Sequence, residues 1–522
     1  MTRYRVWNRL WFQQALLFIV SLLVLLKTMA PTIYYLVDSS EFAIGASTLG
    51  LVHSPGYGLY LLLAHLFTRL PFGDVAFRVN LFSVLVLALT APILFTTLAH
   101  VVRDRLIGAA STLIFIWSYY VWLTGVAAEI YAPQILTLAA ALWALAVLVR
   151  FPERQRWMAP LAGVLFGLAV AIHPSSGFFA PGVVVAFRLA GVSWKRSIVA
   201  GILAAGVFLL SLLYFPVAYV QNPEFNTAGE YAADGTFDAV NLTLPQGILW
   251  LVSGAQFGGF FFSEGIFPSL RQIGATLGLF WSNFLGFGFI LGLIGVYVLY
   301  RTERRLFVIW LVLFAPYTYF YMTYGAPDSD TMFGPSFLLW TFLIACALQW
   351  FTGQITAPAA RRGKRGRQPE PAPQTTGLTT QQLVKLGLAV ALPAILLVVN
   401  WRVVDASGVT GVRQKAETIM EYLPENAIVF GNWIDIIALQ YLQIIEQERP
   451  DLMLYNLYYF DDDDFYAFLT DVVEAETVPV VIMHSTLSTQ AKTAFIDNVY
   501  QLTPILAADA ESTVVGYRIT EP

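Results

Sequence analysis

Two carboxylates, Asp38 and Glu41, follow the first long apolar stretch of the chain. If this segment is helical, their spacing of three residues places both side chains on one face. A carboxylate beside a membrane can act as a general base, position a cation or hold a hydroxyl-bearing acceptor. A helix cap followed by a solvated acid is the structural alternative, and the spacing leaves both interpretations open.

Further residues that could take part in catalysis or binding lie where apolar stretches end. His53 stands in a Pro- and Gly-rich turn, where it either donates to a phosphate or only shapes the turn. Glu129 and His173 also lie at such ends. Glu129 is either an interfacial anchor or part of a site, and His173 is either a turn residue or part of a site. Asp328 and Asp330 form an Asp-x-Asp pair that could ligate a metal through oxygen, although an acidic turn is the simpler interpretation.

The composition places these residues in a membrane protein. Hydrophobic residues make up 57% of the 522 residues, charged residues only 12%, and the mean hydropathy is +0.65. Soluble proteins carry about 25% charged residues. The single cysteine, Cys346, excludes disulfides within the chain and thiolate metal clusters. We expect a polytopic protein of the bacterial inner (plasma) membrane, whose first apolar stretch is retained as a span.

The apolar stretches predict about eleven transmembrane helices. They lie near residues 10–30, 79–102, 106–124, 131–150, 158–172, 175–190, 197–220, 274–300, 306–324, 333–351 and 383–400. Basic residues cluster at every second connection, which predicts a cytoplasmic N-terminus and an extracytoplasmic C-terminal region. This count requires residues 55–70, which are apolar but short, to form a juxtamembrane helix in the first outer loop.

The chain divides into four parts by composition. Residues 1–351 form the expected transmembrane domain, 352–382 a basic cytoplasmic linker, and 383–400 the last span. Residues 401–522 alternate between strand patterns, at 427–430, 452–455 and 478–483, and helix patterns, which predicts a small extracytoplasmic α/β domain with a partly parallel sheet. No Gly-rich phosphate loop follows these strands, so the domain does not read as nucleotide-binding. The linker reads as a solvated segment, with binding to anionic lipid headgroups as the alternative.

Several segments together resemble a known family. Residues 38–41, 49–57 and 70–80, followed by the Ala-Glu-Ile-Tyr-Ala element at 128–132, are similar to the signature of the protein O-mannosyltransferase-like family. Weaker matches follow at 167–173 and in the C-terminal region. That family belongs to the GT-C membrane glycosyltransferases, which use a polyprenyl-phosphate sugar on the extracytoplasmic face.

The resemblance implies roles for particular residues. Asp38 would be the base in the first outer loop, and Glu41 would assist it. The donor would meet residues of the same motifs, namely His53, Tyr57, Arg78, Glu129, Tyr131 and His173. The sugar would be mannose or a similar hexose, and the acceptor a protein or glycan. Neither a nucleic-acid partner nor a specific cofactor is implied, and a divalent cation remains open.

Two other classes of function remain open from the residues alone. A transporter or flippase of lipid-linked sugars would tend to carry inverted repeats and acids near the bilayer midplane. Here no repeat is visible, and most acids lie at the outer ends of the expected spans. A non-catalytic membrane scaffold predicts that Asp38→Asn leaves function intact.

Overall fold

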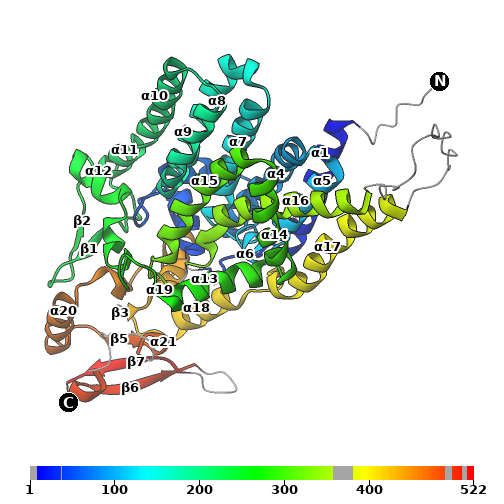
Figure 1. Ribbon diagram of the computed structural model, residues 1–522. Helices are drawn as coiled ribbons and strands as arrows, with labels where there is room; N and C mark the ends of the chain where they lie inside the picture. The colour runs from blue at the N-terminus through cyan, green and yellow to red at the C-terminus, as the bar shows by residue number, and fades with distance from the viewer. Residues whose placement is uncertain are drawn as a thin grey trace, which may run out of the picture.

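The computed structural model describes residues 9–36, 38–327, 329–356, 380–487, 496–507 and 514–521. Helices dominate residues up to about 420, and a small sheet follows at the C-terminal end (Figure 1). Asp328 and most of the expected linker at 352–382 lie outside the described residues.

Eight helical segments of the described chain are long and apolar enough to cross a membrane. They are α1 (Leu10–Thr28), α4 (Val75–Val102), α7 (Tyr131–Arg150), η2 with α8 (Pro152–Ile172), α10 with α11 (Trp194–Val220), α15 (Arg304–Met322), η5 (Thr331–Phe333) with most of α16 (Gly334–Thr356), and most of α17 (Thr380–Val404). A ninth candidate is α13 (Leu270–Asn283) with α14 (Phe287–Thr302), although the chain bends by 109° between these two helices. The expected multi-pass helical class is confirmed.

Two of the expected eleven spans are shorter than the sequence suggested. The segment 106–124 divides into α5 (Arg105–Ile116) and α6 (Tyr119–Leu123), because Ser118 has an extended backbone and interrupts the helix. The segment 175–190 begins as a 3₁₀ turn, η3 (Pro174–Phe179), so that α9 (Ala180–Leu189) has only ten residues. Apolar composition overestimated both lengths, since it does not report where the backbone bends.

The loop between α1 and α4, which the sequence analysis placed on the outer side, carries two short helices, as expected. They are α2 (Ser39–Thr48) and α3 (Gly58–Thr68), and the eleven residues of α3 are too few to span a bilayer. One side of α3 is buried, while Leu62, Leu63 and Leu66 are exposed. A helix that exposes leucines on one side and packs on the other suits the boundary between protein and lipid.

The segment between α11 and α13, here called the α11–α13 segment, packs against the loop between α1 and α4. It contains the hairpin β1 (Gly229–Tyr231) and β2 (Phe237–Ala239), then α12 (Pro245–Val252) and η4 (Ala255–Phe260). Tyr231 stacks on Phe460, with 4.7 Å between ring centroids. The hairpin therefore packs against the C-terminal domain.

The C-terminal domain has the expected α/β composition. Its sheet has the strand order β4-β3-β5-β7-β6, in which β3 is parallel to both of its neighbours and β7 is antiparallel to β5 and β6. The strands are β3 (Ile428–Gly431), β4 (Met453–Asn456), β5 (Val480–Met483), β6 (Gln501–Leu506) and β7 (Val514–Thr520). The helices α18 (Gly411–Tyr422), α19 (Trp433–Gln440), π-helical η6 (Tyr441–Ile445) and α20 (Asp462–Glu474) complete most of the domain. The strand segments predicted from sequence, near 427–430, 452–455 and 478–483, form the parallel part of this sheet.

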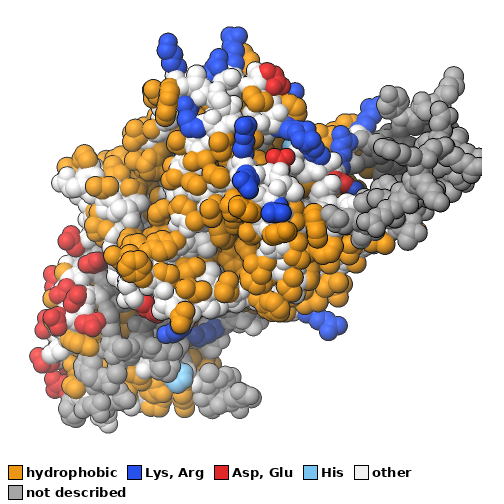
Figure 2. Space-filling model, viewed as in Figure 1, with side chains coloured by type: hydrophobic (Ala, Val, Ile, Leu, Met, Phe, Trp, Pro, Cys, Tyr) orange, Lys and Arg blue, Asp and Glu red, His pale blue; other side chains and the backbone are white. Residues whose placement is uncertain are grey.

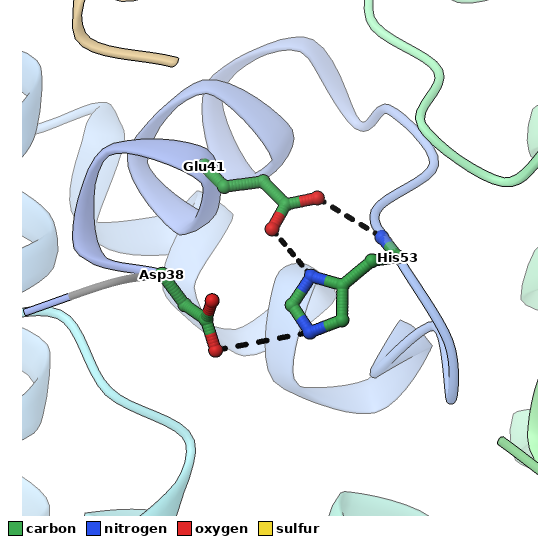
Figure 3. A group of neighbouring side chains, drawn as sticks. All are labelled: Asp38, Glu41 and His53. Carbon is green, nitrogen blue, oxygen red and sulfur yellow. Dashed lines mark hydrogen bonds and ion pairs between the residues drawn. The ribbon is translucent and has the colours of Figure 1, made fainter. Parts of the chain in front are cut away.

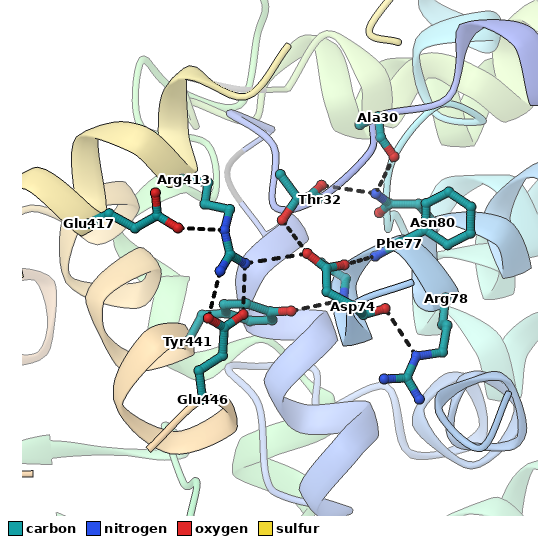
Figure 4. Close-up of polar contacts among 11 residues, drawn as sticks. Ala30, Thr32, Asp74, Phe77, Arg78, Asn80, Arg413, Glu417, Tyr441 and Glu446 are labelled. Atoms are coloured by element: carbon teal, nitrogen blue, oxygen red, sulfur yellow. Dashed lines mark hydrogen bonds and ion pairs between the residues drawn. The ribbon is translucent and has the colours of Figure 1, made fainter. Parts of the chain in front are cut away.

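A polar network joins this domain to the transmembrane helices (Figure 4). Asp74 caps α4 by accepting a hydrogen bond from Phe77 N at 2.6 Å, and its other oxygen lies 3.4 Å from Arg413 of α18. Both terminal nitrogens of Arg413 also donate to Glu446, at 2.7 and 2.6 Å. Tyr441 accepts from Ala76 N at 3.1 Å. We call Asp74, Arg413, Glu446 and Tyr441 the interdomain clamp.

Candidate active site

Asp38, Glu41 and His53 form one buried cluster (Figure 3). Asp38 precedes α2 and Glu41 lies in its first turn, so the spacing brings both to the same side, as expected. His53 lies between them: its Nδ1 contacts Glu41 Oε2, and its Nε2 lies 3.7 Å from Asp38 Oδ2. The backbone N–H of His53 donates to Glu41 Oε1 at 3.0 Å.

The α11–α13 segment holds Glu41 in place through Thr227. Thr227 donates its hydroxyl to Glu41 Oε1 at 2.6 Å. Its backbone nitrogen donates to Leu51 O at 2.9 Å, and Leu51 N donates to Phe225 O at 2.9 Å. Glu41 is fully buried, and a buried carboxyl group is costly unless hydrogen bonds satisfy it. Glu41 is thus held in one orientation toward the imidazole.

The turn after His53 is also held in place. Ser54 donates its N–H to Gln256 Oε1 at 2.9 Å, and its hydroxyl donates to Leu251 O. Gly56 has a φ of 87°, and a Cβ there would lie 2.6 Å from the Phe215 ring. The expected Pro- and Gly-rich turn is present, and it needs a glycine at this position.

The cluster opens into a cavity of about 620 Å³ between the transmembrane helices and the C-terminal domain. Asp38 and His53 lie on its floor. One wall is aromatic, and the C-terminal domain supplies a roof. The wall includes Phe257, Phe260, Phe261 and Phe320; the roof includes Asn432, Trp433, Ile434 and Tyr458.

Three expected donor-site residues, Tyr57, Tyr131 and His173, also line this cavity. The His173 ring lies 5.5 Å from that of Tyr57 and 5.9 Å from that of Tyr131. Burial, followed by the neighbouring charge of His53, lowers the pKa of His173 to about 3. His173 is therefore neutral near pH 7, where its Nδ1 accepts a hydrogen bond from Ser175 N.

Arg78 and Glu129 are not among the residues that line the cavity. Arg78 donates to the carbonyl oxygens of Asp74 at 3.0 Å and Leu70 at 2.9 Å, which ties the end of the α3–α4 loop to α4. Glu129 is buried, and its backbone N–H donates to Ser83 Oγ at 3.2 Å. Their expected roles toward the donor stay predictions, and the geometry gives Arg78 a structural one.

Of the Asp-x-Asp pair, only Asp330 is within the described residues. It accepts a hydrogen bond from Tyr120 at 3.2 Å, and burial raises its pKa. It does not line the cavity, although the neighbouring Ala326 and Pro327 do. A metal site at Asp330 stays a prediction.

The cluster itself has the ligand types that a divalent cation uses. Asp38, Glu41 and His53 each offer one ligand atom, and these atoms lie within 4.8 Å of one another. Two carboxylates and an imidazole suit Mn²⁺ or Zn²⁺. The sequence analysis allowed that Asp38 and Glu41 position a cation, but it named only Asp328 and Asp330 as possible metal ligands, and it did not connect His53 with the two acids.

Sequence reasoning also missed four residues at the site: Thr227, Gln256, Trp433 and Tyr458. Trp433 could have been found, because it follows a predicted strand and α/β domains bind ligands at the carboxyl ends of parallel strands. Thr227 and Gln256 gave no such signal, since their position depends on how the α11–α13 segment packs against the loop between α1 and α4.

Comparison with known proteins supports the resemblance. Residues 38–197 match the family described as protein O-mannosyl-transferase TMEM260 N-terminal domain. The mouse (Mus musculus) protein O-mannosyl-transferase TMEM260 is 38% identical over 117 residues, which cover 22% of this chain and 16% of the mouse protein.

Two solved structures show the same overall arrangement. ArnT from Cupriavidus metallidurans bound to undecaprenyl phosphate has a TM-score of 0.57 at 11% identity, over 97% of both chains. The oligosaccharyltransferase of Archaeoglobus fulgidus tethered with an acceptor peptide has a TM-score of 0.56 at 13% identity, over 99% of this chain and 74% of that one. At these identities the likeness concerns the fold. Residues 38–197 are therefore similar to the TMEM260-type protein O-mannosyl-transferase N-terminal domain, within a chain whose fold is shared with ArnT and with the oligosaccharyltransferase.

Proposed function

We propose that this protein is a membrane glycosyltransferase that moves a hexose from a polyprenyl-phosphate carrier to a hydroxyl-bearing protein or glycan acceptor. The observation that carries the proposal is the buried Asp38–His53–Glu41 cluster on the floor of a cavity of about 620 Å³. Matches to protein O-mannosyl-transferases and the shared fold support the same class.

Asp38 acts as the base in this proposal. Its side chain reaches the cavity and is 13% exposed, whereas that of Glu41 is fully buried. The acceptor oxygen attacks the anomeric carbon while its proton moves to Asp38, and the bond from that carbon to the carrier phosphate breaks. A proton on His53 Nε2 would face Asp38, and Glu41 would hold His53 in the orientation that allows this.

The rest of the cavity divides between the two ends of a lipid-linked donor. The described lining residues include no lysine or arginine, so hydroxyl and N–H groups would meet the phosphate. Tyr57, Tyr131 and His173 lie on this polar side. The phenylalanine wall suits the apolar tail.

We infer that the cavity faces the extracytoplasmic side. The helices α4, α7 and α14 each have a basic residue in or just after the last turn, at Arg103, Arg150 and Arg301. The start of α7, at Tyr131, lines the cavity, as does His173, which directly follows α8. Many Lys and Arg side chains gather at the upper end of Figure 2, beyond a broad hydrophobic belt. Basic ends favour the cytoplasm, which supports the expected location of both termini.

A divalent cation is the alternative use of the cluster. The two nitrogens of His53 already face Glu41 and Asp38, so sharing protons needs no further group. We therefore propose metal-independent transfer. Persistence of transfer in EDTA would support this, and loss of transfer with recovery on added Mn²⁺ would contradict it.

The test is transfer by the full-length protein from a synthetic polyprenyl-phosphate mannose to candidate acceptors. Wild type should transfer the sugar, Asp38→Asn should not, and Asp238→Asn, an exposed acid of β2, should match wild type. Carrier-dependent movement of the intact donor across a vesicle membrane, without transfer, would instead indicate a transporter. Equal activity of wild type and Asp38→Asn would contradict the role of Asp38.

A further inference from the structure

The C-terminal domain places a tryptophan at a ligand-binding position of its own sheet. Strand β3 ends at Gly431, where a Cβ would lie 2.7 Å from Ile436 Cγ1 and 2.9 Å from Met483 Sδ. Asn432 then caps α19 by accepting from Asp435 N at 3.0 Å, so Trp433 is the first helical residue. It stands at the carboxyl end of three parallel strands, where α/β sheets bind ligands.

Polar contacts hold this turn in one position. Asn432 N donates to Thr486 Oγ1 at 2.8 Å, which joins the turns after β3 and β5. Lys415 Nζ donates to Asp435 Oδ1 at 2.6 Å, and Ser485 donates to the other oxygen of Asp435. The indole at the start of α19 is thus fixed by its domain.

The indole meets the candidate catalytic cluster across the domain boundary. Its ring centroid lies 5.1 Å from that of His53 and 6.2 Å from that of Phe257. Trp433 is 6% exposed, and no hydrogen-bond partner is present for its Nε1 among the described residues. A buried N–H group without a partner is costly, and such groups in native structures call for a functional explanation. Beside it in the roof, Tyr458 is 49% exposed.

We propose that Trp433 and Tyr458 bind the pyranose ring of the lipid-linked donor, so that the C-terminal domain selects the sugar. This rests on the proposed function. The faces of aromatic rings carry partial negative charge, which attracts the C–H groups on one face of a pyranose. Tryptophan and tyrosine add polar groups that can meet sugar hydroxyls, which the phenylalanine wall lacks.

The position of the roof favours the sugar over the rest of the donor. In the proposed reaction the anomeric carbon must come within bonding distance of an acceptor oxygen beside Asp38. Trp433 is a roof residue in ring contact with His53, which adjoins Asp38. The phenylalanine side chains that suit the tail come from η4, its C-terminal neighbour Phe261, and α15.

The test separates sugar binding from sugar transfer. The melting temperature of the full-length protein is measured with two short-chain ligands, a polyprenyl phosphate and the same compound carrying mannose. For wild type, mannose should add a further stabilisation. Trp433→Phe, which keeps an aromatic ring in the core, and Tyr458→Ala should lose this increment and bind the mannose ligand about tenfold more weakly. Tyr422→Ala, in the same domain but outside the cavity, is the control.

Each result supports or overturns the proposal. Loss of the mannose increment alone, with the sugar-free ligand bound as in wild type, supports it. An increment that survives both changes, or is absent from wild type, overturns it, as does a change confined to the KM of the acceptor. If wild type shows the increment but transfers no sugar, the proposed function fails while the sugar site stands.

Discussion

Two clusters of charged residues lie near the boundary between the membrane helices and the C-terminal domain, and they are built differently. In the Asp38–Glu41–His53 cluster, an imidazole stands between two carboxylates. In the interdomain clamp, a guanidinium stands between Asp74 and Glu446, with Glu417 as a third acid at 2.7 Å. Both clusters place one cationic side chain among acids, and both use a carboxylate at the start of a helix.

The difference lies in what the cationic group can do. Arginine keeps its proton throughout the physiological range, and hydrogen bonds to Glu446 raise the pKa of Arg413 further. Histidine exchanges its proton near neutral pH, and only its cluster opens into the cavity. A permanent charge away from the cavity suits a contact that holds two domains together. An exchangeable proton that faces the cavity suits proton transfer to or from a bound ligand. Whether a cluster of acids near a membrane is structural or catalytic is therefore judged from the basic side chain that it holds.

The strongest way to break this comparison is to remove the exchangeable proton. His53→Gln keeps a side chain that can hydrogen-bond to Glu41, but the amide cannot take up a proton. We expect kcat to fall about 10²-fold, with little change in melting temperature, because the lost contribution is proton transfer. His484→Gln, on an exposed residue of the C-terminal domain, is the control. A kcat close to wild type would place His53 outside the chemistry.

The opposite result is expected at the clamp. Arg413→Met should lower the free energy of unfolding by about 2 kcal/mol, since Glu446 and Asp74 lose charge-assisted hydrogen bonds. The measurement is thermal unfolding in detergent, with kcat measured at low temperature. The exposed pair of Arg271 with Glu264, 3.9 Å apart, supplies the control: Arg271→Met should have almost no effect. A large loss of kcat without loss of stability would remove the distinction between the clusters.

Acidification should sharpen the contrast through His173. Its folded-state pKa of about 3 lies below its usual 6.5, so the unfolded chain binds more protons between these values. Stability is therefore lost as the pH falls below 6.5, by about 2 kcal/mol at pH 5. Comparison of melting temperatures at pH 7.5 and 5 checks this. His173→Gln should lose less stability than wild type over the same interval, and an equal loss would contradict the assignment.

The smallest expected effect concerns the support of Glu41. Thr227→Val removes the hydroxyl that donates to Glu41, at a cost of about 1 kcal/mol, and should lower kcat/KM about fivefold. Thr227→Ser should restore most of the activity, because it keeps the hydroxyl. Thr236→Val, which removes an exposed hydroxyl bonded to Asp234, should leave kcat/KM unchanged. Failure of the serine variant to recover would mean that Thr227 acts through its methyl packing.

Local patterns predicted much of this molecule. Apolar runs predicted most of the spans, and strand–helix alternation predicted the parallel strands of the C-terminal domain. The spacing of Asp38 and Glu41 placed both at the start of one helix, because i and i+3 positions share a helix face whatever surrounds them. His53 was a candidate, but its place between the two acids depends on the turn through Gly56.

The missed parts depend on contacts between distant segments. Thr227 reaches Glu41 from 186 positions away along the chain, and Trp433 reaches His53 from the far side of the last span. Neither position is encoded in a local period. Arg78 is a different case: the resemblance implied that it meets the donor, and the structure adds that nearby backbone carbonyls accept its hydrogen bonds, while the implied role stays a prediction.

The shared cavity has a consequence for how the protein becomes active in the cell. Its floor is supplied by residues near position 40 and its roof by residues near 433 and 458, and every candidate span of the described chain except α1 lies between these positions in the sequence. A chain still being synthesised, or cut within the linker, has the floor but no roof. Under the proposed function, the protein would therefore become active only when its synthesis is complete.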